Sequence, residues 1–460
     1  MAGSKGGFIT FLLVLISIVG AFFLGAGAIM MFSPDVSIFG VSYITNKEKV
    51  VISEIKIGGQ QQNLFMEGYK KIIIQTQNAD VSIAYGKANA NESNFILDKN
   101  SAGFYKEGSA TEYSYTLTAQ DDTLKFVLKE PEYSFLTVTS SSRLYVNLSI
   151  NEDNLGKQFE IQTTTGNIAL GVATSASEVM SQFSASKINA ITEKGNISVS
   201  DKIDITDTLN VETTNGKITV SGNLNAENLS FSSQNGRIEA KNILNEESNL
   251  VVKSDTSHIV FGDIAGDIYV DVKNGIFEAK KLGGSIATPN TVVSTKFYIS
   301  EVGGDVQIAN LNGQLGVTID KVKGAVNIST NSGNVKLNEV HGQTYVATTS
   351  ANIKVNVADD NSSDINLKTK DGKITVDFKK IDGQKNITTE SGDIKISTPI
   401  SVAYKLSAIS QKGKVVLEWE DVTFKSGEII SRYIGDGPLQ GDDLTISTVS
   451  GDISIERYAA

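Results

Sequence analysis

Apolar and polar residues are arranged in two different ways along this chain, and the first is a single uninterrupted apolar run. Residues 8–32 read FITFLLVLISIVGAFFLGAGAIMMF, which is 25 residues without a charge. About 20 apolar helical residues cross a bilayer core, so the run predicts one N-terminal transmembrane helix with residues 1–7 as a cytoplasmic tail. A cleaved signal peptide is the alternative interpretation, because Ala26-Gly27-Ala28 has the small residues of a cleavage site.

The residues around this run predict its orientation and one packing feature. Lys5 precedes it and Asp35 is the first charge after it, which favours a cytoplasmic N-terminus and export of the rest. We therefore expect a single-pass protein of the cell membrane whose C-terminal part is extracytoplasmic. Ser17, Ala21 and Gly25 recur every four residues and form a stripe of small side chains that would let a second helix approach closely. Ordinary transmembrane composition also accounts for this stripe.

The second pattern is a short motif that recurs through most of the remaining chain. Each copy has a Thr or Ser three residues before a Gly, followed by a polar residue and an alternation of apolar and polar positions. Clear copies begin at Thr163, Thr213, Thr330, Thr389 and Thr448, and degenerate ones at Thr76 and Thr348. The copies keep a constant spacing, as shown by Gly195, Gly216 and Gly236, which are 21 and 20 residues apart. A second series half a period away contains Gly284, Gly304 and Gly324, each 20 residues apart.

This spacing predicts an all-β fold, a β-solenoid built from coils of about 20 residues. The alternation gives each piece one apolar face, as in a half-buried strand. Gly after Asn, Ser or Asp suits a tight corner with positive φ. A unit of about 20 residues cannot bury its apolar face alone, whereas stacked coils can. Stacking should turn inward the residues Ile168, Ile197, Val199, Ile218, Val220, Ile238, Val335, Leu337, Ile374, Val376, Ile394, Ile396 and Ile453. A set of β-sandwiches is the alternative, but sandwich strands would not need one motif at a fixed phase.

Departures from the repeat divide the chain further. Residues 33–69 are expected to form a juxtamembrane stalk or cap, and residues 70–460 the solenoid, with insertions at 86–120, 172–190 and 418–443. The 172–190 insertion is rich in Ala and Ser and suggests a short helical excursion. The 418–443 insertion holds the only tryptophan, Trp419, and is expected to cap the C-terminal end.

The insertion at 86–120 carries several aromatic residues and has two interpretations. It could be a hairpin that covers the N-terminal end of the solenoid. Alternatively, it could protrude and contact a partner, because exposed aromatic side chains make good interface anchors. The candidate contact residues are Phe104, Tyr105, Tyr113 and Tyr115.

Composition excludes several kinds of chemistry. The chain has no cysteine, so disulfides and thiolate metal sites are impossible, and it has only two histidines. The net charge of −11 makes nucleic acid an unexpected partner. No phosphate-binding loop or nucleophile-elbow motif occurs, and His258 follows Asp255 and Ser257 only at a repeat position. We therefore expect no catalytic residue, no cofactor and no metal.

The phased repeats resemble those of the bacterial putative-adhesin family, a domain of unknown function with T-x-S-G-D-I-x-I solenoid repeats. The likeness lies in residues 76–83, in residues 142–150 with the Gly166 repeat, and in residues 433–437 leading into 448–455. It implies a cell-envelope β-solenoid, often membrane-tethered, for which adhesion is proposed. The chain departs from the family pattern at the 86–120 insertion and near Ser257 and Ser294, where the repeat lacks its glycine.

Three hypotheses of function follow. The first is a non-enzymatic, membrane-tethered envelope protein that acts as an adhesin-like binding or structural surface for a protein or glycan ligand. The second is a scaffold that forms homo-oligomers by stacking solenoid ends, since those ends expose strand edges. The third is a polysaccharide-binding or polysaccharide-cleaving β-helix, in which acids from successive coils would line one cleft.

Overall fold

The computed structural model describes most of the chain and divides it into two compact units. The described residues are 4–32, 37–38, 41–85, 93–106, 113–130, 136–148, 157–171, 183–200, 203–289, 294–310, 316–435 and 443–459. Unit 1 comprises residues 1–183 and unit 2 residues 184–460. Of the 172–190 insertion, residues 172–182 lie outside the described part, whereas residues 183–190 belong to a strand instead of a helix.

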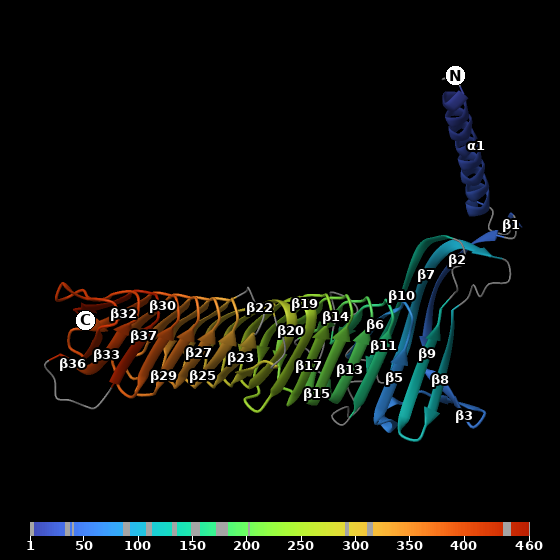
Figure 1. The fold of residues 1–460 in the computed structure, drawn as a ribbon. Coiled ribbons are helices and arrows are strands. Elements are labelled where there is room, and N and C mark those ends of the chain that lie inside the picture. The colour runs from blue at the N-terminus through green and yellow to red at the C-terminus, as the bar shows by residue number, and fades with distance from the viewer. Residues whose placement is uncertain are drawn as a thin grey trace. The chain divides into compact units, whose positions relative to one another are not determined.

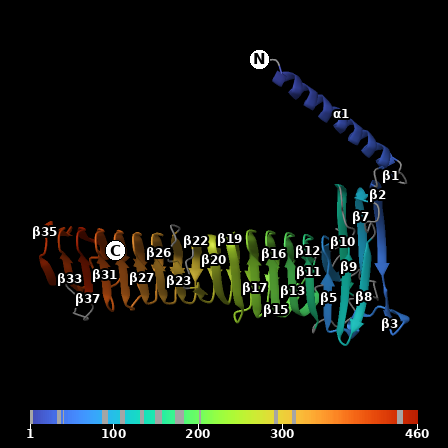
Figure 2. The ribbon, with the colours of Figure 1, turned by 45° about the vertical axis from the view of Figure 1, so that its right-hand side comes forward.

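Unit 2 is a stack of coils in which two ladders of parallel strands run side by side (Figures 1 and 2). Ladder one contains, in spatial order, β14 (Ile197–Val199), β16 (Ile218–Leu224), β18 (Ile238–Ile243), the second halves of β19 (Asn249–Ile264) and β20 (Asp267–Leu282), β22 (Ser294–Val302), β24 (Val317–Val322), β26 (Val335–Val340), β28 (Ile353–Val357), β30 (Ile374–Phe378), β32 (Ile394–Pro399), β38 (Ile453–Tyr458) and β34 (Val415–Leu417). Ladder two contains β13 (Phe183–Thr192), β15 (Ile203–Thr213), β17 (Asn228–Ser233), the first halves of β19 and β20, β21 (Ile286–Ala287), β23 (Val306–Asn310), β25 (Val326–Thr330), β27 (Thr344–Thr348), β29 (Ile365–Thr369), β31 (Lys385–Thr389), β37 (Asp443–Thr448) and β33 (Tyr404–Ser410).

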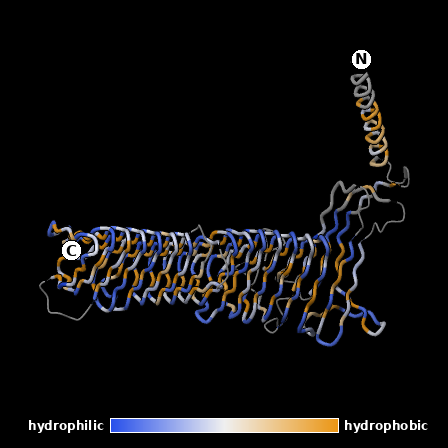
Figure 3. The backbone as a smooth tube through the Cα atoms, in the orientation of Figure 1, coloured by the Kyte–Doolittle hydropathy of each residue, from blue (hydrophilic) through white to orange (hydrophobic). Residues whose placement is uncertain are grey.

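Strand register places the same repeat position of each coil directly over that of the next. Ile353 pairs with Ile374 and Ile374 pairs with Ile394, so one apolar column continues from coil to coil. Hydrophobic and hydrophilic positions alternate along these strands (Figure 3). All the residues expected to turn inward are at most 2% exposed. Since a fully buried Val, Leu or Ile contributes about 1.5–3 kcal/mol, this column supplies much of the stability of each coil. The predicted all-β solenoid is confirmed for unit 2.

The repeat glycines are required for a different reason from the one predicted. The backbone at Gly216, Gly236, Gly372 and Gly392 is not in the positive-φ region, so the expected left-handed corner is wrong there. Instead, each of these glycines lies against the preceding coil. A Cβ added to Gly216 would lie 1.7 Å from the carbonyl oxygen of Gly195, and one added to Gly392 would lie 1.8 Å from that of Gly372. The second series forms a similar column, because a Cβ on Gly324 would lie 2.3 Å from the oxygen of Gly304.

The Thr or Ser of the motif holds this corner through its hydroxyl group. The Thr213 hydroxyl accepts a hydrogen bond from the Gly216 N–H at 2.9 Å and donates one to the Gly195 carbonyl at 3.0 Å. The same pair of bonds recurs at Ser233, which accepts from Gly236 and donates to Gly216. The hydroxyls are buried, at 1% exposure for Thr213, so each one satisfies two backbone groups that water cannot reach.

The C-terminal coil does not occupy the end of unit 2. β37 lies between β31 and β33, and β38 lies between β32 and β34. The last repeat in the sequence is therefore inserted between two coils formed by earlier residues. The end coil, β33 and β34, is covered by the antiparallel strands β36 (Ile429–Ile434) and β35 (Val422–Phe424). Residues 418–443 contribute these two strands, although residues 436–442 lie outside the described part.

Unit 1 repeats this arrangement in its own coils. β5 (Lys71–Gln75) lies between β11 (Gln158–Thr163) and β9 (Thr123–Lys129), and β6 (Asp80–Tyr85) lies between β12 (Ile168–Leu170) and β10 (Leu136–Leu148). Antiparallel strands cover the open edges: β8 (Ser114–Gln120) pairs with β9, β7 (Asn94–Lys106) with β10, and β2 (Val41–Ile52) with β7. The described parts of the 86–120 insertion are therefore the antiparallel strands β7 and β8.

The first elements of unit 1 include the predicted stalk. β1 (Ser37–Ile38) pairs with β2, and β3 (Glu54–Ile57) pairs with β4 (Gln60–Asn63) in a separate two-stranded sheet. The short 3₁₀ helix η1 (Met66–Gly68) follows them. Residues 33–69 thus contribute both to the cover, through β2, and to a small hairpin.

The apolar run lies in one helix, α1 (Ser4–Phe32). Its described side chains are mostly exposed, for example Leu24 at 76% and Phe23 at 57%. Ser17 donates to the carbonyl of Leu13 at 2.9 Å, and a Cβ on Gly25 would meet nothing within 4 Å. Over the described residues, no helix reaches the length and hydropathy of a membrane span. The membrane helix and its small-residue stripe stay predictions.

Candidate functional site

The outer faces of the coils in unit 2 are the candidate functional surface, because alternate residues of every strand point outward. On ladder one these outward positions carry charges that pair between coils. Lys321 bonds to Glu339 at 2.7 Å and Lys395 to Glu456 at 2.8 Å. The Lys321 and His341 side chains lower the pKa of Glu339, and Lys395 lowers that of Glu456. These pairs are exposed and contribute little to stability individually.

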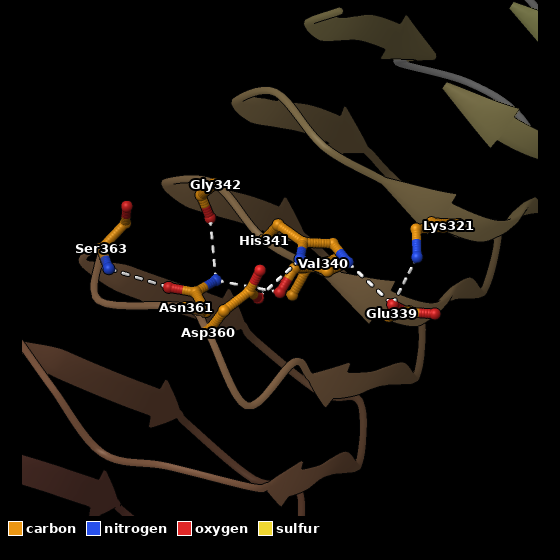
Figure 4. A network of polar contacts seen from close by, with 8 residues as sticks. All are labelled: Lys321, Glu339, Val340, His341, Gly342, Asp360, Asn361 and Ser363. Atoms are coloured by element: carbon orange, nitrogen blue, oxygen red, sulfur yellow. Dashed lines mark hydrogen bonds and ion pairs between the residues drawn. The ribbon is translucent and has the colours of Figure 1, made fainter. Parts of the chain in front are cut away.

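One polar network on this surface surrounds His341 (Figure 4). The Nδ1 atom of His341 lies 2.6 Å from Asp360 Oδ1, and its Nε2 atom lies 2.8 Å from Glu339 Oε1. Both ring nitrogens therefore face carboxylates, and neither faces a nucleophile. Asn361, which is fully buried, donates to the carbonyls of Val340 and Gly342 at 3.0 and 3.1 Å. The network holds a corner of the coil and lacks the base–nucleophile contact of hydrolytic catalysis.

The second histidine also lacks a catalytic arrangement. The Ser257 hydroxyl points inward and donates to the Gly236 carbonyl at 2.5 Å, whereas His258 Nε2 lies 3.3 Å from Glu278 Oε1. Adjacent residues on a strand point to opposite faces, so Ser257 and His258 do not act on one substrate.

Two buried lysines satisfy backbone carbonyls. Lys157, 3% exposed, donates to the oxygens of Met66 and Tyr69 at 2.6 and 3.0 Å. Lys385, fully buried, donates to the carbonyls of Ser363 and Asp382. Each ammonium group thus donates hydrogen bonds to backbone carbonyls, which is a structural role.

A buried carboxylate in unit 1 has a similar task. Burial raises the pKa of Glu130, which is 8% exposed. Its Oε2 atom accepts hydrogen bonds from the backbone N–H of Asn78 at 2.9 Å and from the side-chain amide of Asn78 at 2.5 Å. Ser142 donates to the other oxygen at 3.3 Å. Glu130 therefore supplies the acceptors that this corner requires. Over the described residues, no group of three acids or histidines could hold a metal ion.

Of the four aromatic residues predicted to contact a partner, three have side chains that the structure describes, and one of these three is exposed. Phe104 and Tyr113 are buried, at 5% and 7% exposure, and so belong to the cover of unit 1. Tyr115 is 42% exposed and its ring stacks on Phe126 at 5.6 Å. The side chain of Tyr105 lies outside the described residues. A contact role stays a prediction, and Tyr115 is the described residue best placed for it.

Ladder two carries a shallow groove that the sequence reasoning did not identify. Its volume is about 320 Å³, and it is lined by Asp305, Val306, Gln307, Ala325, Val326, Asn327, Gln343 and Tyr345. These residues follow successive members of the second glycine series. Aligning the chain on Gly304, Gly324 and Gly342 would have brought Gln307, Asn327 and Tyr345 into one column. The groove can offer amide, carboxylate and aromatic groups to a ligand.

Comparison with solved structures finds only distant likeness. A "putative cell adhesion protein" from Clostridium sporogenes is 9% identical, with a TM-score of 0.15 and coverage of 90% of this chain and 100% of the other. A "putative adhesin" from Parabacteroides merdae is 11% identical, with a TM-score of 0.16 and coverage of 91% and 97%. A "putative lipid binding protein" from Parabacteroides distasonis is 11% identical, with a TM-score of 0.18 and coverage of 90% and 97%. Scores this low support no further conclusion.

Comparison of sequences gives a more definite result. No curated protein matches the chain. A family model does match residues 261–456, which comprise the coils from the end of β19 to β38. The resemblance inferred from the repeats is thereby confirmed, because residues 261–456 match the model of the family described as Toastrack DUF4097.

Proposed function

We propose that this chain is a non-enzymatic protein of the cell envelope that presents its coils as an adhesin-like binding or structural surface. Residues 8–32 would tether it to the cell membrane as a single span, and the solenoid would lie outside the cytoplasm. Its ligand would be a protein or a glycan.

The observation that carries this proposal is the distribution of polar groups in unit 2. The apolar side chains are enclosed between the two ladders, and the outward positions form regular arrays of polar side chains across many coils. The ring nitrogens of His341 contact two carboxylates, and the Nε2 atom of His258 lies beside a carboxylate of Glu278. Such an array suits recognition through many weak contacts better than it suits bond cleavage.

The tether has separate support from α1. The segment has 25 uncharged residues, and its described apolar side chains, such as Leu24 and Phe23, are exposed. Exposing so much apolar surface to water is unfavourable, at about 25 cal/mol per Å², so a lipid environment or a partner would stabilise the helix.

Protease shaving of intact cells, followed by mass spectrometry, tests the proposal. We expect peptides from residues 184–460 to be released from intact cells, and residues 1–7 to be cut only after lysis. A cytoplasmic protein of similar abundance, which must stay uncut, is the control. Release of solenoid peptides only after lysis would contradict the proposed location.

End-to-end assembly is a second candidate because of one feature of β36. This strand pairs with β33 on one side, and among the described residues no strand pairs with its other side. Ile429 and Tyr433 on β36 are 71% and 58% exposed. Light scattering across a concentration series should then show oligomers that Ile429→Lys dissociates, whereas Ile400→Lys, at a 56% exposed position outside β36, should not. A monomer at every concentration would exclude assembly.

A further inference from the structure

Five outward residues of ladder two stand in one column, which we name the amide column. Register pairs each of them with the next: Gln307 with Asn327, Asn327 with Tyr345, Tyr345 with Asn366, and Asn366 with Asn386. Strand spacing of about 4.8 Å sets the distance between neighbours. Four amides and one phenol ring thus form a straight, uncharged strip across five coils.

The side chains of the amide column differ from other stacked amides in unit 2. Elsewhere, Asn235 donates to Asn215 at 2.9 Å and Asn242 donates to Asn223 at 3.0 Å, so these amides form hydrogen bonds with the amides of the neighbouring coil. Within the described residues, the side chains of the amide column make no hydrogen bond to the protein. Their donors and acceptors therefore remain available to a ligand.

The groove of about 320 Å³ lies along one end of this column. It forms where Ala325 stands between two coils that carry Asp305 and Gln343 at the equivalent positions, so a small side chain leaves a hollow between longer ones. Tyr345 borders the hollow with 41% of its surface exposed. Asp305 accepts a hydrogen bond from the Ala325 N–H at 2.8 Å, which directs that carboxylate oxygen toward the backbone.

The chemistry of the groove selects for a neutral ligand rich in hydroxyl groups. Amides present a donor and an acceptor side by side, which matches the vicinal hydroxyls of a sugar. A tyrosine ring offers an apolar face that can pack against the C–H face of a sugar ring, and its hydroxyl remains polar. The lining contains no lysine or arginine within the described residues, so an anionic polymer would meet no counter-charge there.

We propose that the groove beside Tyr345 binds a neutral, hexose-based glycan, with Gln307, Asn327 and Gln343 bonding to its hydroxyls. This inference rests on the proposed function and names the ligand class of the same surface. The rest of the amide column, Asn366 and Asn386, extends the site so that a chain of several sugars contacts successive coils.

Titration calorimetry on the full chain tests the site. The protein is held in lauryldimethylamine oxide micelles, a detergent without sugar, and the probes are maltohexaose, cellohexaose and mannohexaose. Hexagalacturonate serves as the charged comparison. We expect saturable binding of at least one neutral hexamer and weaker binding of the uronate.

Two variants and a matched control locate the binding. Tyr345→Ala should weaken it about tenfold, as expected for loss of a central aromatic contact. Tyr269→Ala is the control, because Tyr269 lies in register two coils before Gln307, is 38% exposed and does not line the groove. It should change the affinity less than about twofold. Ala325→Gln should fill the hollow and weaken binding while removing no contact group.

Three results would overturn the inference: no neutral hexamer binds, hexagalacturonate binds more tightly, or Tyr345→Ala and Tyr269→Ala behave alike. Circular dichroism of each variant checks that it has folded. If shaving finds the solenoid exposed while every glycan fails to bind, only the ligand assignment is wrong. If glycans bind but the solenoid is cytoplasmic, only the proposed function is wrong.

Discussion

The buried hydroxyl column makes a sharp prediction at Thr213. Replacing Thr213 by valine keeps the shape and the β-branch and removes only the hydroxyl. The Gly216 N–H then loses its acceptor at 2.9 Å, and the Gly195 carbonyl loses a donor at 3.0 Å. Leaving a buried polar group unsatisfied costs about 1–3 kcal/mol, so we expect Thr213→Val to destabilise its coils by about 2–4 kcal/mol.

Thr219→Val is the matched control for this change. Thr219 lies six residues later, half-buried on the outer face of β16, so the same substitution there removes a hydroxyl that water can reach. We expect it to change stability by less than about 0.5 kcal/mol.

Hydrogen exchange followed by mass spectrometry of the full chain is the suitable assay, because coils in a solenoid interact mainly with their neighbours and open locally. A loss of about 2.8 kcal/mol corresponds to exchange about 100-fold faster for peptides covering residues 203–224 in Thr213→Val. Equal exchange rates in the two variants would refute the role given to the buried hydroxyl.

Three further predictions concern other corners and the surface. Gly372→Ala should cost at least about 3 kcal/mol, because its Cβ would lie 1.8 Å from the Ala351 oxygen, whereas Gly68→Ala, with nothing within 4 Å, should be nearly neutral in the same exchange assay. Burial raises the pKa of Glu130 above its usual 4.5, so the contribution of Glu130 to stability should be greatest in acid and should fall as pH rises through the folded pKa. Lowering the pH should therefore slow hydrogen exchange near Asn78 more in the wild type than in Glu130→Gln. A larger slowing in Glu130→Gln than in the wild type would contradict this role. Lys321→Met should leave exchange around β24 and β26 unchanged, because its ion pair with Glu339 is exposed, and a measurable loss would show that the network is cooperative.

The local structure of the coils could be predicted because the residue pattern within each motif determines it. A period of two places Ile218 and Val220 on one face, and both are buried. The requirement for glycine at position 216 could also be predicted, but the physical reason for it could not, as Gly216 shows. Positive φ is a local property, whereas the clash with the Gly195 carbonyl exists only once a neighbouring coil is present. The same holds for Phe104 and Tyr113, whose burial depends on strands that pair far along the chain.

The groove beside Tyr345 could not be predicted from the sequence, for a related reason. Gln307, Asn327 and Tyr345 are ordinary outward residues of three separate repeats. They form a surface only when the coils are aligned, and the hollow appears only because Ala325 falls between two longer residues.

The sequence by itself determined that the chain folds as coils of about 20 residues, which side chains face inward, and where the corners are, because these follow from short-range periodicity. Only the tertiary structure decided which coils are neighbours. All the coils offer nearly the same backbone edge, so local sequence does not say that β37 and β38 enter between earlier coils. That order depends on contacts between distant residues, and so do the covering strands and the surface available to a ligand.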